Sequence, residues 1–147
     1  MNKYRSHNCN ELRKEDIGSK TVLSGWINKK RDHGNLLFID IRDNYGITQC
    51  IIDKNNSKFS DLEKIQLETV IQISGKVIER SKDTINKDIE SGDIEVAIEN
   101  FNILGSCKEL PIPVFSDQEY SEEIRLKYRF LDLRRKKIHE NIILRSS

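Results

Sequence analysis

The residues that this 147-residue chain lacks narrow the classes of protein to which it can belong. It has only three cysteines, which lie far apart and form no C-x-x-C or Cys/His spacing suited to zinc, so no metal site or disulfide scaffold is expected. Its longest apolar run, Leu36 to Ile39, is far too short to span a bilayer. Residues 1–10 lack the apolar core of a signal peptide. We therefore expect a cytoplasmic protein with unpaired thiols and no membrane partner.

An excess of charge of one sign is also lacking. The 25 Lys and Arg residues face 24 Asp and Glu residues, which gives a net charge of +1. No global field therefore attracts a polyanion such as a nucleic acid, and any attraction must come from local clusters. Two basic clusters are present, one at residues 29–31 and one between residues 125 and 145.

Alternating apolar and polar residues predict a protein made mainly of strands. In the second such segment Leu37, Ile39 and Ile41 alternate with polar or aromatic neighbours, which places these three side chains on the inner face. Gly25 predicts a bulge or bend in the first strand. A helical period replaces the alternation at residues 57–68. The expected strands span residues 21–32, 35–43, 47–53, 69–80 and 94–104.

The order of three strands, a helix and two strands predicts a five-stranded Greek-key barrel of the OB-fold type. We expect this domain to occupy residues 1–108, with residues 81–93 as a polar loop between its last two strands. A linker with both prolines of the chain follows at residues 109–120. A capping box at residues 116–119 then predicts helical structure, and residues 121–147 end within an expected helix. This ending indicates a piece of a longer protein.

The outer face of the second strand carries a candidate binding site. Phe38 points outward, where a phenyl ring on an OB barrel can stack a nucleobase. Lys29, Lys30 and Arg31 lie one turn away and could bind phosphate, and Gln49 on the next strand offers a donor and an acceptor to a base edge. The alternative is a structural barrel in which Phe38 is an ordinary surface aromatic and the cations are solvated.

Three segments resemble bacterial-type aspartyl-tRNA synthetases in order and spacing. They are GWINKKRDHGNLLFIDIRDNYGITQCIID at residues 25–53, INKDIESGDIEV at residues 85–96, and EEIRLKYRFLDLRR at residues 122–135. The resemblance implies that the barrel binds the anticodon of tRNA(Asp), with its bases splayed out and read separately. This agrees with the exposed ring and cations, because unstacked RNA loops offer free base faces and edges.

The resemblance also implies roles for single residues. The positions that contact anticodon bases in that family are occupied here by Arg31, Phe38, Gln49 and Glu95, with Phe38 in the stacking position. The family often has a further arginine where Ile78 stands, and Arg80 is expected to substitute for it. His33 resembles the residue found in enzymes that charge tRNA(Asn) as well as tRNA(Asp), and Thr84 is expected near a second position of this kind.

The parent enzyme implied by the resemblance is a homodimeric class II aspartate–tRNA ligase. It would attach aspartate to tRNA through an aspartyl-adenylate, with ATP and Mg2+ as cofactors. The F-R-x-E and G-x-G-x-x-x-R motifs around that ATP do not occur in this sequence, so the chain is expected to bind tRNA without charging it and to hold no cofactor. Residues 122–135 resemble the hinge into the catalytic domain. A free-standing OB module that binds single-stranded nucleic acid is the alternative, and such a module does not need this hinge.

Overall fold

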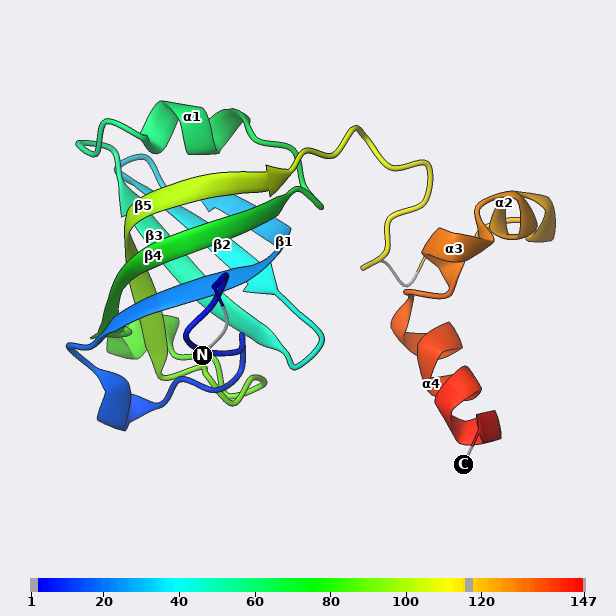
Figure 1. The fold of residues 1–147 in the computed structure, drawn as a ribbon, viewed down its shortest axis with the longest axis horizontal. Coiled ribbons are helices and arrows are strands. Elements are labelled where there is room, and N and C mark those ends of the chain that lie inside the picture. The colour runs from blue at the N-terminus through cyan, green and yellow to red at the C-terminus, as the bar shows by residue number, and fades with distance from the viewer. Residues whose placement is uncertain (1–2, 116–117, 147) are drawn as a thin grey trace. The chain divides into compact units, whose positions relative to one another are not determined.

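A computed structural model describes residues 3–115 and 118–146 of the chain. The chain forms two compact units, Met1–Lys108 and Glu109–Ser147. The first unit contains all five strands and α1, which lies across one end of the sheet (Figure 1). The strands are β1 (Lys20–Asp32), β2 (Leu36–Arg42), β3 (Ile47–Asp53), β4 (Val70–Glu79) and β5 (Ile94–Gly105).

The five strands close into a barrel in the order β1-β2-β3-β5-β4. The first three strands form an antiparallel meander. β4 is antiparallel to both β1 and β5, whereas β3 and β5 are parallel and pair only at Cys50 with Val96 and Ile51 with Ala97. The crossover from β3 to β4 passes through α1, so the predicted OB-fold barrel is confirmed.

β1 pairs with two different strands because it is long and bends near its middle. Up to Trp26 it pairs with β4, and from Trp26 onward it pairs with β2. The register shifts between Ile27 and Lys29, so the bulge lies just after Gly25 and not at it. Gly25 is required for a different reason, because a Cβ atom there would lie 2.3 Å from the backbone oxygen of Arg42. The extra residue of the bulge moves every later side chain of β1 to the opposite face.

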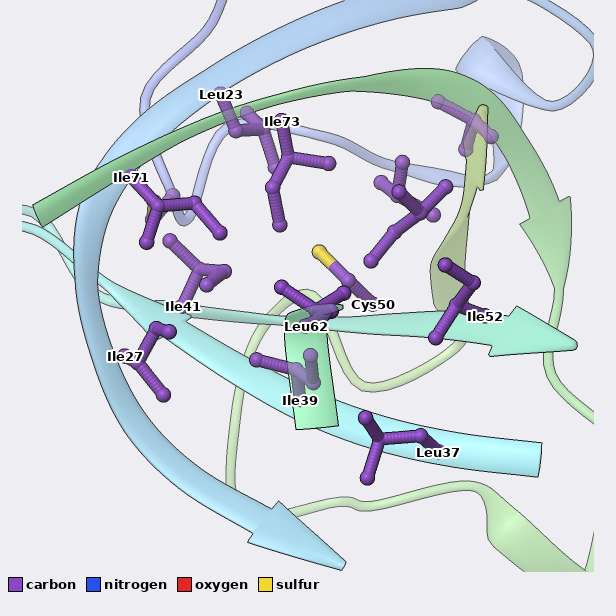
Figure 2. Packing of buried hydrophobic residues seen from close by; sticks show 14 of the residues in the cluster. Leu23, Ile27, Leu37, Ile39, Ile41, Cys50, Ile52, Leu62, Ile71 and Ile73 are labelled. Carbon is purple, nitrogen blue, oxygen red and sulfur yellow. The ribbon is translucent and has the colours of Figure 1, made fainter. Parts of the chain in front are cut away.

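The core of the first unit consists of inward side chains from all five strands and α1, together with Cys9 and Leu12 from the segment before β1. Leu37, Ile39 and Ile41 of β2 are at most 2% exposed, as the alternation predicted. Figure 2 shows them converging with Leu23, Ile27, Cys50, Ile52, Ile71 and Ile73, while Leu62 enters from α1. Leu62 is fully buried, so the helix closes one end of the barrel. The burial of these apolar side chains is the main force that holds the strands together.

The helix is shorter than the sequence pattern predicts, because the chain must turn back to begin β4. α1 spans Phe59–Lys64 rather than residues 57–68. Glu68 takes a left-handed backbone conformation with φ 65°. Its carboxylate accepts two hydrogen bonds from the Arg42 guanidinium, at 3.0 and 2.9 Å. This nearly buried ion pair joins the connection between α1 and β4 to β2.

The described residues of the second unit form three short helices, in agreement with the predicted helical structure. They are α2 (Glu122–Lys127), α3 (Arg129–Asp132) and α4 (Lys136–Ser146). Asp132 is 1% exposed and pairs with Arg125 at 3.2 Å and with Arg135 at 3.4 Å, which connects the first two helices to the start of the third. The predicted capping box begins at residues 116–117, which lie outside the described residues. None of the helices in the described ranges is long and apolar enough to cross a membrane.

Candidate nucleic-acid interface

A groove of about 440 Å³ runs over the outer surface of the first unit, between the β1–β3 sheet and the connection from β4 to β5. It collects six of the nine site residues predicted from the sequence, from segments up to 53 positions apart. These six residues are Arg31, His33, Phe38, Gln49, Arg80 and Thr84. Leu36, Asp40, Ile47, Asn86 and Ile89 complete its lining.

Phe38 lies in this groove as a partly exposed ring. It pairs with Arg31 of β1 and Ile51 of β3 across the sheet, and its neighbours Leu37 and Ile39 point into the core. The ring of His33 meets it edge to face, with centroids 5.1 Å apart and an interplanar angle of 79°. Such an aromatic pair is favourable and limits how far the Phe38 ring can turn. The Phe38 ring is therefore restrained by His33, lines the groove and is not fully covered by other parts of the chain.

A chain of polar contacts crosses the sheet beside Phe38. The Arg31 guanidinium donates to Asp40 at 2.8 Å and to the amide oxygen of Gln49 at 3.0 Å. The amide nitrogen of Gln49 donates to Glu95 at 2.7 Å. Because the amide has a cation on its oxygen side and a carboxylate on its nitrogen side, its orientation is fixed by charge. Gln49 is 5% exposed and forms the floor of the groove together with Arg31 and Asp40, whereas Glu95, at 7% exposed, is not part of the lining.

Acidic and basic side chains are balanced in number around this polar chain. Arg31 and Arg80 face Asp40 and Glu95, which gives two cations and two carboxylates. Burial raises the pKa of Asp40, although Arg31, Arg80 and Lys29 act to lower it. Burial also lowers the pKa of Arg80 from its usual value. The charged groups of the groove are therefore matched in sign, and the groove is not a cationic patch.

Arg80 is the most deeply placed cation of the groove, at 4% exposed. Its Nε donates to the backbone oxygen of Ile94 at 2.9 Å, and its Nη1 donates to the backbone oxygen of Thr84 at 3.2 Å. Its Nη2 is buried and has no hydrogen-bond partner among the described residues. A buried donor without an acceptor costs about 1–3 kcal/mol, so this nitrogen favours an acceptor supplied from outside the chain.

The two lysines of the 29–31 cluster have different positions. Lys29 pairs with Asp40 in the sheet and is exposed at the edge of the outer face. Lys30 points the other way, and its Nζ donates to the backbone oxygens of Glu63 and Ile65, both at 2.6 Å. It thereby satisfies carbonyls at the C-terminal end of α1, where a cation is favoured. The structure brings neither lysine into the lining of the groove, and Lys30 has a structural role.

Replacing each lysine by methionine should separate the two roles. Lys30→Met should lower the free energy of unfolding by about 1 kcal/mol, because two carbonyls at the end of α1 lose their donor. Lys29→Met should leave stability unchanged and lower the salt dependence of RNA binding by about one ion, as loss of one phosphate contact does. Urea unfolding and binding titrations at several salt concentrations measure both effects. Equal stability of the two variants would contradict the assignment of Lys30.

The sequence did not identify five further residues that line the groove, among them Asp40, Asn86 and Ile89. Asp40 could have been found, since it alternates with Phe38 on the outer face and pairs with Gln49. Asn86 and Ile89 could not, because they lie in the polar segment between β4 and β5, whose path depends on distant contacts. Their position makes this segment a wall of the groove.

Known proteins of similar sequence cover nearly the whole chain. A protein named aspartate–tRNA(Asp/Asn) ligase from Pelagibacter ubique is 74% identical over 99% of this chain. One of the same name from Rhodopseudomonas palustris is 52% identical over the full chain. The chain spans 25% of the length of each. The predicted resemblance to aspartyl-tRNA synthetases is confirmed by these relatives.

Structural and family comparisons agree with this result. The asparaginyl-tRNA synthetase of Pyrococcus horikoshii, solved with asparaginyl-adenylate, superposes with a TM-score of 0.73 at 29% identity, over 87% of this chain and 28% of that one. Residues 21–104, more than half of the chain, match the tRNA anti-codon family, described as OB-fold nucleic acid binding domain. All residues that line the groove lie within this matched region. The chain therefore belongs to the family of OB-fold nucleic acid binding domains.

Proposed function

We propose that the groove binds the unstacked bases of a tRNA anticodon loop and that the chain is the anticodon-binding region of an aspartate–tRNA ligase. The observation that carries this proposal is that Arg31, Phe38, Gln49 and Arg80, drawn from four strands or their ends, line one groove. Phe38 would stack one base, which contributes roughly 1–3 kcal/mol. The polar floor beside it would read the edges of that base or its neighbour.

The charge balance of the floor favours contact with bases over contact with phosphates. Arg31 already has a carboxylate partner in Asp40, so its net attraction for another anion is small. Its remaining guanidinium nitrogens have no hydrogen-bond partner in the described part of the chain, and they can donate to ring nitrogens or carbonyls of a base. Gln49 retains one amide proton and one lone pair beyond its two contacts, and Glu95 retains acceptor capacity.

Beyond this chain, we propose the activity of the whole protein of which it is a part. That protein would ligate aspartate to tRNA(Asp) with ATP and Mg2+, would act as a homodimer, and would reside in the cytoplasm. The names of the relatives and the three free thiols support this. The two ATP-site motifs do not occur in this sequence, so the residues of this chain supply no part of the adenylate chemistry.

We further propose that tRNA(Asn) is a second partner. His33 and Thr84 both line the groove, one beside Phe38 and one in the wall opposite the sheet. In the proposed complex they would be in reach of the anticodon base that distinguishes the two tRNAs. The name of the relatives, aspartate–tRNA(Asp/Asn) ligase, includes both tRNAs and supports this proposal. Charging of each tRNA by the whole enzyme would test it, and exclusive charging of tRNA(Asp) would refute it.

A binding titration tests the proposed function on the chain itself. A hairpin carrying the guanine-uracil-cytosine anticodon should bind more tightly than hairpins of the same stem with scrambled loops, because only the former offers the edges that the floor reads. Equal affinity for every loop would instead support a general single-stranded nucleic-acid-binding module. No binding to any hairpin at low salt would support a structural barrel.

A further inference from the structure

We infer that Glu90 is a positioning residue for the anticodon groove, because it fastens the loop wall to the N-terminal segment. The loop wall is defined as residues 81–93, between β4 and β5, and the N-terminal segment as residues 7–18, before β1. Both lie at the same end of the barrel (Figure 1). This inference rests on the proposed function of the groove. It concerns a residue that lies outside the groove lining.

Glu90 receives two hydrogen bonds from residues almost 80 positions away. One carboxylate oxygen accepts from Arg13 at 2.7 Å and from the side-chain amide of Asn10 at 3.1 Å. Both donors are themselves held. The Arg13 guanidinium also donates to the backbone oxygen of Asn10 at 2.6 Å, and a Cβ on Gly46 would lie 2.5 Å from the Asn10 Cβ, so no space is left for Asn10 to move toward the β2–β3 turn.

The loop wall has few other connections to the barrel. At its start, Thr84 is held through Arg80, and near its end the Ser91 hydroxyl donates to the backbone oxygen of Ile47 at 2.6 Å. The wall also folds on itself, since the Asn86 amide donates to the backbone oxygen of Gly92 at 3.1 Å. A second ion pair, Lys14 with Asp93 at 3.6 Å, joins the same two segments. Glu90 therefore adds the anchor nearest to Ile89.

Fixing the wall before RNA arrives should strengthen binding. Thr84, Asn86 and Ile89 face the sheet across the groove, and a wall that moves freely must be ordered when a base enters. A segment with few buried contacts opens locally unless such anchors hold it. The Arg13–Glu90 pair is exposed, with side-chain exposures of 40% and 70%, so its effect is expected to be modest and to weaken in salt.

The experiment compares Glu90→Ala with a matched control, Glu99→Ala. Glu99 also forms an exposed ion pair, with Lys20 at 3.9 Å, and neither residue lines the groove. Both variants lose one negative charge, which by itself strengthens binding to RNA. We expect Glu90→Ala to weaken binding of the anticodon hairpin by about 2- to 5-fold. The charge effect alone would strengthen binding, so a weaker affinity cannot come from the lost charge. Glu90→Gln, which keeps an acceptor for Asn10 and Arg13, should retain part of the affinity.

Amide hydrogen exchange provides a readout that does not need RNA. The backbone amide of Asn86 should exchange faster in Glu90→Ala than in the wild-type chain. The exchange rates of the backbone amides in the barrel strands and the midpoint of thermal unfolding should remain unchanged. If the wild-type chain binds the hairpin and Glu90→Ala binds equally well or better, the inference is wrong. If the wild-type chain does not bind the hairpin, the proposed function is wrong. The role of Glu90 in holding the loop wall is then judged by hydrogen exchange alone, and equal exchange rates of the Asn86 backbone amide in Glu90→Ala and the wild-type chain would overturn it.

Discussion

Replacing Phe38 by alanine should weaken binding of the guanine-uracil-cytosine hairpin by about 5- to 150-fold, the equivalent of roughly 1–3 kcal/mol for one stacked base. The ring lines the groove and is partly exposed, so its loss removes contact area with the ligand more than it opens the core. Phe38→Tyr should retain most of the affinity, because it keeps an aromatic face. The loss should be similar for every loop that places an unpaired base there, since stacking tolerates any base.

A matched control is available on the same barrel. Tyr45 lies in the turn between β2 and β3, is 57% exposed and does not line the groove. Tyr45→Ala should therefore leave the affinity within about twofold of the wild-type value, which is the size of effect that a typical surface substitution has. Isothermal titration or fluorescence anisotropy with all three variants measures the difference. Equal affinities for Phe38→Ala and Tyr45→Ala would remove the stacking role.

Replacing Arg31 by alanine should reduce discrimination between the correct loop and single-base variants by on the order of 1–3 kcal/mol, the usual value of a good base contact by a guanidinium. The reason is that Arg31 is paired with Asp40 and Gln49 on the floor of the groove, where its free nitrogens can reach a base edge. Because its charge is already balanced, the salt dependence of binding should change less than in Lys29→Met.

The two variants thus form a contrast between reading a base and attracting a phosphate. Affinities for the correct hairpin and for each single-base variant, measured at three or more salt concentrations, separate the two effects. If Arg31→Ala weakens binding to all loops by the same factor and lowers the salt slope by about one ion, Arg31 contacts phosphate and the charge-balance argument is wrong.

The barrel could be predicted from sequence because its core follows a simple period. Leu37, Ile39 and Ile41 point inward, and the same alternation places Phe38 and Asp40 on the outer face. The period also puts Glu95 on the outer face of β5. What it could not predict is that Glu95 and Gln49 are nearly buried there, because they pack against each other and against Arg31, which come from distant parts of the chain.

The bulge in β1 illustrates a second limit of the sequence. Without the register shift after Ile27, the alternation of β1 would point Lys29 and Arg31 toward the core. A bulge depends on how a strand fits its partner, and Gly25 indicated the bend without giving the position of the extra residue. The same shift turns Lys30 toward α1, so a cluster that reads as three equivalent cations becomes one exposed cation, one helix cap and one floor residue.

Mapping the hairpin-binding surface of the chain residue by residue by NMR tests most directly the claim that the groove binds the anticodon loop. On titration with the guanine-uracil-cytosine hairpin, the largest amide shift changes should fall on β2, on β3 and on residues 81–93, and they should shrink in Phe38→Ala. Changes centred on the outer face of β4, around Gln72 and Ser74, would place the RNA on the other side of the barrel and contradict the account.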